Sequence, residues 1–486
     1  MGIRDLIPDS LLEIGSDQVV AIRLDENLFD IGIDSLIEFE PDTITKTFSI
    51  APIIEFTFNP GQTFYSSFES FTFGDVEAQL SQAILKRGKL ILIAENSIDG
   101  DLNFILNIPK AKKYGESLSI IQTVPGSSGS QNGILQYEFD ISDYVLDLTG
   151  QSGNVFNVLD VQFILSNPLT GEPIIAYNTD TVHLSLSYSD LELKFATGYF
   201  GSESISLSEG SVIDAFDEFN DVSIGVDEVN AELIFTNGFG IDIQASIFQF
   251  KAMNSLSGNS LNLSHDLIGS NINLSRSGLS GYEPIPYQKN YTLNNSNSNI
   301  TSFLELLPDS IFINANANLN PFGNISNYND FISSESRLRC DIALTIPLKF
   351  SLSNLSIRDT TELNWPENEN FTIQSGNLFL QASNSFPVNI TLKIKALDQL
   401  NNTLLDLNTY LVDPVGLIAG RQTNESTLSL LKFSLSEDAV AQLKTAKKLA
   451  ITGNFETTNY PENVIFNESD SLKIKIITDL NSTLSF

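Results

Sequence analysis

Hydrophobic and polar residues alternate along this chain in pairs of short segments that flank an asparagine. The clearest copy runs from Gly376 to Ala396, where two alternating segments surround Asn384. A period of two on both sides of an Asn-centred turn is typical of antiparallel strands with one buried face. The same pattern occurs around Asn237 and Asn96. We therefore predict three β-hairpins, each with an asparagine at its turn.

A second kind of hairpin is predicted between the copies of the first. Its turns are centred on Asn167 and Asn320, each followed by proline, and a degraded version lies near Asn454. In chain order the six asparagines are separated by 71, 70, 83, 64 and 70 residues. Intervals of this regularity are typical of repeated modules. The pattern predicts a unit that occurs three times.

Two further markers accompany the second hairpins. A polar N-cap and a short helix-compatible run precede each of them, starting at Ser142, Asn299 and Ser436. An alternating strand follows each of them, starting at His183, Pro347 and Ser471. Because four markers recur in one order, they favour triplication. One more short helix is expected within residues 75–87, where apolar residues have helical spacing.

The fold class predicted from these patterns is all-β, with β-sandwich-like modules in tandem and few short helices. The expected divisions are an N-terminal segment 1–75 and three repeat units, 76–211, 212–361 and 362–486. Residues 254–299 of the second unit are rich in Ser and Asn and predict a long loop. Residues 5–11 match residues 305–311, so the N-terminal segment is interpreted as a half-repeat.

Charge excludes some classes of partner. The chain has 60 acidic and 26 basic residues, for a formal net charge of −34. Such a field repels phosphate backbones, so nucleic-acid binding is not expected. One cysteine, Cys340, allows no intrachain disulfide, and no zinc or calcium motif occurs. No apolar run has the length of a membrane-spanning helix. We expect no cofactor and no metal.

The sequence carries none of the common motifs for catalysis. It contains no Gly-x-Ser-x-Gly elbow, no phosphate-binding loop and no His-Glu-x-x-His helix. A pair of acids acting as a glycosidase would not be visible in the sequence, since the two need not be close along the chain. We expect a protein that is not an enzyme, with no catalytic residues.

Aromatic residues mark the candidate interaction segments. Tyr199 and Phe200 lie in the glycine-flanked string 195–201, which is either a packed joint between domains or a shelf for a ligand. Tyr282 and Tyr287 lie in the predicted loop 254–299. Long loops on a rigid scaffold commonly carry recognition. These four side chains are the predicted points of contact with a partner.

The strings 195–201, 230–248, 306–320 and 339–359 resemble those of uncharacterised exported envelope proteins of gliding-type Gram-negative bacteria. That resemblance covers most of the chain and implies an exported protein, often a lipoprotein, with no assigned activity. The lipid-attachment cysteine of such lipoproteins is absent from this sequence. The strand-Asn-Pro-strand arrangement is also distantly similar to the water-stress β-sandwich modules of late-embryogenesis proteins.

The resulting hypothesis is a non-enzymatic protein of the cell envelope or cell surface. It would act as an elongated scaffold, an adhesin or a subunit of an envelope assembly, with a protein or glycan partner. Its location would be periplasmic, outer-membrane-associated or at the cell surface, if an export signal was replaced by the starting Met; otherwise the chain is cytosolic. One alternative is a carrier of lipid or another apolar ligand between splayed sheets lined by Ile241, Ile243, Ile390 and Leu392. A second alternative is a carbohydrate-binding protein.

Overall fold

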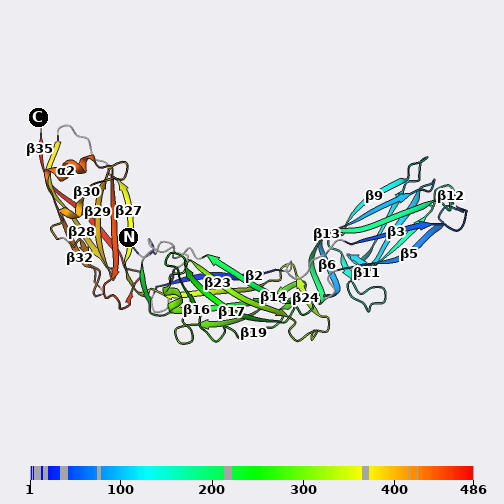
Figure 1. Cartoon of the computed structure of the whole chain (residues 1–486), viewed down its shortest axis with the longest axis horizontal. Coiled ribbons are helices and arrows are strands. Elements are labelled where there is room, and N and C mark those ends of the chain that lie inside the picture. Colours follow the sequence, from blue (N-terminus) through cyan, green and yellow to red (C-terminus); the bar gives the residue numbers. More distant parts are fainter. Residues whose placement is uncertain are drawn as a thin grey trace.

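The chain is built almost entirely of antiparallel strands, as a computed structural model of residues 2, 4, 12–14, 20–32, 42–73, 78–212, 222–363, 371–413, 415–423 and 425–484 describes it. Strands make up 63% of the chain, and two short α-helices occur in the described part, α1 (Ile300–Glu305) and α2 (Glu437–Thr445). The predicted all-β fold class is confirmed. Figure 1 shows three β-sandwiches that follow one another along the longest axis of an elongated, bent molecule.

The first sandwich is formed by strands that alternate buried and exposed side chains. Two of them, β6 (Gln79–Asn96) and β13 (Thr181–Tyr199), continue beyond this sandwich toward the second one (Figure 1). A two-stranded ribbon of β4 (Glu55–Phe58) and β12 (Ile174–Tyr177) lies at its far end. The other strands are β3 (Thr43–Ser49), β5 (Thr63–Thr72), β7 (Leu102–Lys113), β8 (Glu116–Val124), β9 (Gly133–Asp140), β10 (Val145–Asp147) and β11 (Val158–Ser166).

The second sandwich combines strands from the middle of the chain with β2 (Val20–Ile31). One edge of β2 pairs with β25, and the other pairs with β1 (Leu12–Ile14). Figure 1 shows β2 as a blue strand in an otherwise green body. The other strands are β14 (Ser204–Val212), β16 (Asn230–Asn237), β17 (Ile243–Asn254), β18 (Asn259–Asn262), β19 (Asn271–Leu274), β22 (Tyr287–Leu293), β23 (Ser310–Leu319) and β25 (Leu338–Pro347), with a ribbon of β20 (Gly278–Ser280) and β21 (Glu283–Ile285).

The third sandwich contains strands from the C-terminal part of the chain, and α2 packs against it. Its strands are β27 (Leu355–Glu362), β28 (Phe371–Asn384), β29 (Val388–Leu397), β30 (Thr403–Asp406), β31 (Leu417–Ile418), β32 (Thr427–Leu435), β33 (Lys448–Thr457) and β35 (Leu472–Leu484). Between it and the second sandwich lies a three-stranded sheet of β15 (Ser223–Val226), β26 (Lys349–Ser353) and β34 (Val464–Ile465).

The strands pair in the same order in all three sandwiches. The strand that ends at the first asparagine (β6, β16, β28) lies between β9 and β13, between β22 and β25, and between β32 and β35. The strand after that asparagine (β7, β17, β29) pairs with β11, β23 or β33, which pairs in turn with β5, β14 or β27. Each unit therefore has two layers of strands with one shared topology, and in the first unit β10 pairs with both β6 and β7 and joins the two layers into one sheet.

The predicted hairpins are wrong, although the strands themselves are present. The strands on the two sides of Asn96, Asn237 and Asn384 pair with other strands and not with each other. The same holds for the strands around Asn167 and Asn320. Each turn takes the chain from one sheet to the other, across a sandwich about 10 Å thick.

The N-terminal segment 1–75 does not form a sheet of its own within the described part. Its strand β2 pairs with β25 of the second sandwich, whereas β3 and β5 pair with β13 and β11 of the first. The matching residues 5–11 lie outside the described residues. The paired strands of the third unit begin at Leu355 and those of the second at Ser204, before the predicted boundaries at 362 and 212.

Three local predictions differ in part from the structure. Helices form after Asn299 and Ser436, but the run after Ser142 is not helical, because Asp140 accepts hydrogen bonds from Ser142 and the chain then enters β10. Residues 79–87 belong to β6 and not to a helix; residues 75–77 lie outside the described residues. The predicted loop 254–299 contains the short strands β18 to β22.

Candidate functional site: the asparagine turns and the joints between sandwiches

Three buried asparagines make the same hydrogen bonds where the chain changes sheets. The Nδ2 of Asn384 donates to the backbone oxygens of Val388 (2.9 Å) and Ala419 (3.3 Å), and its Oδ1 accepts from the N–H of Phe386 (3.0 Å). Asn96 binds Gly100, Pro125 and Ile98 in the same way, and Asn237 binds Ile241, Ser275 and Phe239. The amide thus replaces the strand partners that a turn between sheets lacks.

The residue five positions after each of these asparagines binds the same distant loop. The asparagine donates to one backbone oxygen of that loop, and the residue at +5 accepts, through a side-chain oxygen, a hydrogen bond from the backbone N–H of the next loop residue. The pairs are Asp101 with Gly126 (2.8 Å), Asp242 with Arg276 (3.0 Å) and Asn389 with Gly420 (3.0 Å). Two side chains therefore fix one loop against each turn. This second position was not predicted, although the recurrence of Asp or Asn at +5 was visible in the sequence.

The second set of turns is fixed by a contact to the beginning of each unit. Nδ2 of Asn167 donates to the backbone oxygen of Phe58 at 3.0 Å, and Nδ2 of Asn320 donates to that of Gly201 at 3.0 Å. In the third unit the buried Oγ1 of Thr457 donates to the backbone oxygen of Leu352 at 3.4 Å. The polar residue with this role is therefore Thr457, three positions after the predicted Asn454.

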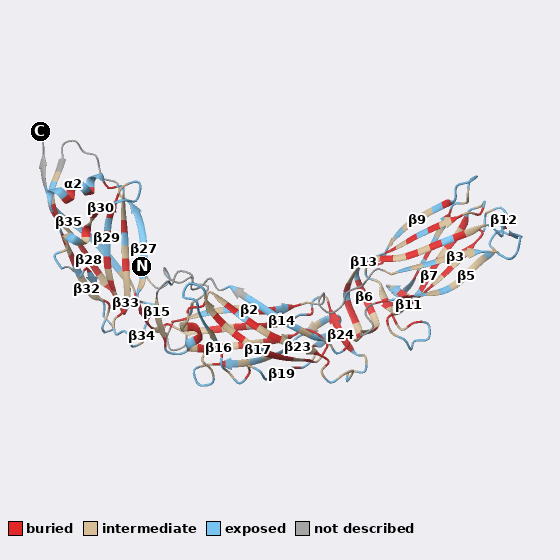
Figure 2. Cartoon of the chain, in the orientation of Figure 1, coloured by how far each residue is buried: buried red, intermediate tan, exposed pale blue. Residues whose placement is uncertain are grey.

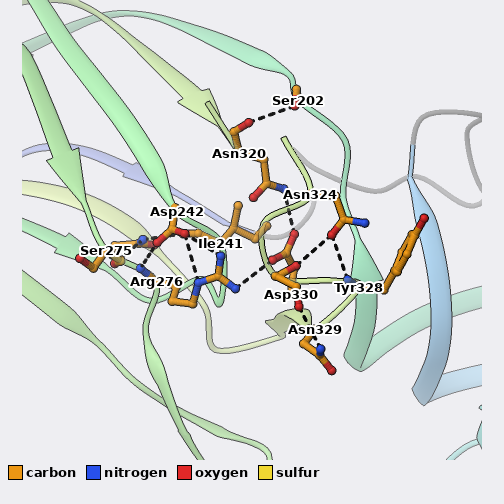
Figure 3. A network of polar contacts seen from close by, with 12 residues as sticks. Ser202, Ile241, Asp242, Ser275, Arg276, Asn320, Asn324, Tyr328, Asn329 and Asp330 are labelled. Atoms are coloured by element: carbon orange, nitrogen blue, oxygen red, sulfur yellow. Dashed lines mark hydrogen bonds and ion pairs between the residues drawn. The ribbon is translucent and has the colours of Figure 1, made fainter. Parts of the chain in front are cut away.

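A buried polar network lies at the end of the second sandwich that faces the first (Figure 3). The side chain of Asp330 is fully buried. Its Oδ1 accepts a hydrogen bond from Nη1 of Arg276 at 3.2 Å, and its Oδ2 accepts one from Nδ2 of Asn320 at 2.9 Å. Arg276 also donates from Nε and Nη2 to Oδ2 of Asp242, at 3.2 and 2.6 Å. One guanidinium thus compensates two carboxylates, one of them in the core.

The charges of this network shift its titration. Burial raises the pKa of Asp242, whereas hydrogen bonds from the side chain and backbone of Arg276 lower it. Together the lowering effects outweigh burial, so the pKa lies below its ordinary value. Burial lowers the pKa of Arg276, whereas Asp242 and Asp330 raise it, with a net rise. Both groups are therefore held in their charged forms.

The network adjoins an aromatic joint between the first two sandwiches. The strand β24 (Asp330–Ser333) pairs with the part of β13 that continues beyond the first sandwich. There the ring of Phe195 stacks on Phe331, with 5.8 Å between centroids, and lies 5.1 Å from the ring of Tyr282. A second contact stacks Phe156 on Tyr328 at 4.4 Å. The string that contains Phe195 is thus part of a packed joint.

The four aromatic residues predicted to contact a partner have different environments. Phe200 is buried in the core, and Tyr199 donates or accepts a 2.8 Å hydrogen bond with Oγ of Ser202. Tyr282 packs on Phe195 while remaining 48% exposed. Tyr287 lies in β22, opposite Asn237. Only Tyr282 combines a place in the joint with a large exposed surface.

The joint between the second and third sandwiches has a similar composition. Phe350 stacks on Phe466 at 4.5 Å, and Phe386, two residues after the turn asparagine, packs beside them. Arg421 binds the nearly buried Asp470 through Nε and Nη2, at 3.2 and 3.1 Å. The asparagine turns of the second and third sandwiches therefore both lie in joints.

The corresponding end of the first sandwich is the far tip of the molecule (Figure 1). The ribbon β4–β12 and the turns beside it expose large apolar side chains there. They are Ile53, Ile54, Phe56, Leu169, Ile175 and Tyr177. A cluster of this kind at the end of an elongated body is typical of an interaction surface.

The cores of the sandwiches leave little space for a ligand, and a larger hollow of about 270 Å³ lies between β2 and β14 and is open to solvent. The residues named for a lipid-lined tube, Ile241, Ile243, Ile390 and Leu392, are buried in the cores. A cavity in the first sandwich between Phe71, Leu118 and Tyr188 measures about 10 Å³, whereas a pocket for a small ligand takes about 300 Å³ or more.

Cys340 lies in the core of the second sandwich, where burial raises the pKa of its thiol. Within the part of the chain that the structure describes, no three His, Cys, Asp or Glu side chains converge as metal ligands. None of the described helices is both long enough and apolar enough to cross a membrane.

Comparison with known proteins yields structural likenesses alone. No protein-family profile and no curated protein matches the chain. It is structurally similar to a putative secreted protein from Parabacteroides distasonis ATCC 8503, at 13% identity and a TM-score of 0.33, over 59% of this chain and 84% of that one. It is also similar to a structure of infectious bursal disease virus Gt strain, at 11% identity and a TM-score of 0.14, over 95% and 90% of the two chains.

Proposed function

We propose that this protein is a non-enzymatic extracytoplasmic scaffold or adhesin of the cell envelope, built from three copies of one β-sandwich module. The observation that carries the proposal is the end-to-end arrangement of three sandwiches of one topology, with the asparagine turns of the second and third lying in the joints. The recurring hydrogen bonds of Asn96, Asn237 and Asn384 support a common module. Rigid joints keep the two ends of such a molecule apart.

The apolar tip is the proposed contact with a protein or glycan partner. It lies at the end of the molecule opposite the third sandwich, where an elongated body places a binding surface farthest from an attachment point. The strongly negative net charge keeps the rest of the surface soluble.

Small-angle X-ray scattering and a glycan array test this function. We expect scattering from an elongated, bent particle, and binding that the double variant Ile54→Ser/Leu169→Ser reduces about tenfold. Both side chains are mostly exposed, so the variant should fold. Leu256→Ser, in an exposed turn of the second sandwich, is the matched control. A compact particle, or turnover of a glycoside in a hydrolase screen, would contradict the proposal.

A further inference from the structure

Among the described residues, the third sandwich has no counterpart of a strand that pairs with the outer edge of the first two. In the first sandwich β3 pairs with the outer edge of β13, and in the second β2 pairs with the outer edge of β25. The equivalent strand of the third sandwich is β35, which pairs with β28 on its inner side. On its outer side, the described residues provide one isolated bridge, from Ser471 just before the strand to Gly2.

The strands β2 and β3 cover the seam between the two layers, although a hollow open to solvent remains between β2 and β14. Opposite β3, Leu184 and Leu186 of β13 are 2% and 1% exposed, and Phe48 of β3 reaches Tyr65 of β5 in the other sheet, with 5.4 Å between ring centroids. In the second sandwich Phe29 of β2 is buried opposite Cys340, which is 0% exposed. Each closing strand therefore removes apolar side chains of its neighbour from water.

The corresponding seam of the third sandwich is open. Ile474 and Ile476 pair with Ala382 and Leu380, whose side chains are buried, so all four face the interior. Yet Ile474 is 48% and Ile476 is 65% exposed. By register from the turn asparagine they correspond to the buried Leu184 and Leu186 of the first sandwich.

The opposite side of this seam is exposed as well. The strand β27, which forms the edge of the other sheet, is almost wholly pale blue in Figure 2. Its Ile357 pairs with Gly453 on the inward face and is 48% exposed. A 13-residue edge strand with exposed inward isoleucines is a template for pairing with another strand.

We propose that the outer edge of β35 pairs antiparallel with β35 of a second copy of this chain. The charges of β35 are self-complementary in that arrangement. If a twofold axis places Ile477 opposite Ile477 of the second copy, Lys475 lies opposite Asp479 of that copy. If the axis places Ile476 opposite Ile476, Lys473 lies opposite Asp479 of the second copy. Either register gives two symmetric ion pairs and brings the inward isoleucines of both copies together.

The second copy also fits the polarity of the precedents in this molecule. Both β2 and β3 run antiparallel to the strands they cover, as β35 of the second copy would. Lysines on an edge strand ordinarily oppose pairing with other strands, because the partner must supply acidic groups at the right spacing. Asp479 supplies that group here, so the lysines select this partner.

Sedimentation velocity of the full chain between about 1 and 200 µM, a range that brackets typical weak dimers, tests the proposal. We expect the mass to double with rising concentration. Ile474→Lys/Ile476→Lys should remain monomeric with unchanged thermal unfolding, since both side chains are already about half exposed. Ile134→Lys on β9 is the control, because Ile134 is also 65% exposed.

A charge exchange keeps the test independent of the apolar variants. Lys473→Glu/Lys475→Glu should raise the dimer dissociation constant at least about tenfold, and adding Asp479→Lys should restore it. A wild-type chain that stays monomeric over the whole range would overturn the proposal. So would a dimer that survives Ile474→Lys/Ile476→Lys, or one that Ile134→Lys disrupts equally.

Discussion

At the scale of single residues, buried amides hold this fold in a way that apolar packing cannot. Each turn asparagine satisfies two backbone oxygens and one N–H that have no partner in either sheet. Removing one side chain leaves several buried backbone groups unpaired, and each such group costs about 1–3 kcal/mol. The asparagines are therefore fixed by hydrogen bonding rather than by the conformation of a tight turn.

We expect Asn384→Ala to lower the free energy of unfolding of the third sandwich by about 3 kcal/mol, because it removes three buried hydrogen bonds. Denaturant unfolding followed by circular dichroism measures this change. Asn402→Ala, at an exposed turn of the same sandwich, should cost about 0.5 kcal/mol or less. Equal effects of the two variants would show that the buried amide has no special role.

A second prediction concerns acid. The pKa of Asp242 is lower in the folded chain than in the unfolded one, so its stabilising contribution is complete above the unfolded pKa of about 3.9 and is lost as pH falls through the folded value. Asp242→Asn should therefore reduce stability at neutral pH and flatten its decline below about pH 4. Unfolding midpoints of both proteins, measured from pH 7 to pH 2, check this expectation. If stability of Asp242→Asn falls with pH as steeply as that of the wild type, Asp242 does not contribute in this way.

At the scale of elements, the sequence predicts strands well and their partners poorly. The alternation around Asn384 located β28 and β29, because a half-buried strand imposes a period of two wherever it lies. It could not distinguish a hairpin from a turn between sheets, since both need a polar turn residue between alternating segments. Only partners far along the chain, such as β35 for β28, decide that question.

The candidate site shows the same division. The turn asparagines were found because they recur at intervals, whereas Asp330 and Arg276 form their contact once, across 54 residues, and carry no repeated signal. The helix at Ser436 formed because its hydroxyl caps the N–H of Ala439. The run after Ser142 has a comparable polar start, but its chain is drawn into a sheet.

The strand β2 yields a prediction at this scale. Phe29→Ala should destabilise the second sandwich by about 3 kcal/mol, although Phe29 lies far outside that unit in sequence, because its ring is buried in the core. Thermal unfolding should show a lower midpoint for the transition in which the second sandwich unfolds. Phe68→Ala on β5, with a ring that is 53% exposed, is the control and should change little. No effect of Phe29→Ala would mean that β2 contributes nothing to the core.

At the scale of the whole molecule, the joints determine how far the two ends lie apart. The first joint combines strand pairing between β13 and β24 with the rings of Phe195 and Phe331. The pairing restricts bending in the plane of the sheet, and the rings fill the space beside it. Such joints hold the first two sandwiches end to end.

We expect Phe331→Ala to loosen this joint without unfolding the sandwiches, because Phe331 packs in a small cluster apart from the main cores. Small-angle scattering should show a broader distribution of distances and a shorter mean end-to-end length. Phe322→Ala changes an exposed ring in the same connection and should leave the scattering unchanged. Identical curves for all three proteins would mean that the ring does not stiffen the joint.

The path of β2 has a consequence for synthesis on the ribosome. Ile22 pairs with Ile346, so β2 waits for a partner that emerges about 320 residues later. At roughly 10 residues per second that delay is about half a minute. During this time the first sandwich can fold, while the edge of β2 that will pair with β25 stays open to holding factors. Completion of the middle body is thus timed by translation of its last strand.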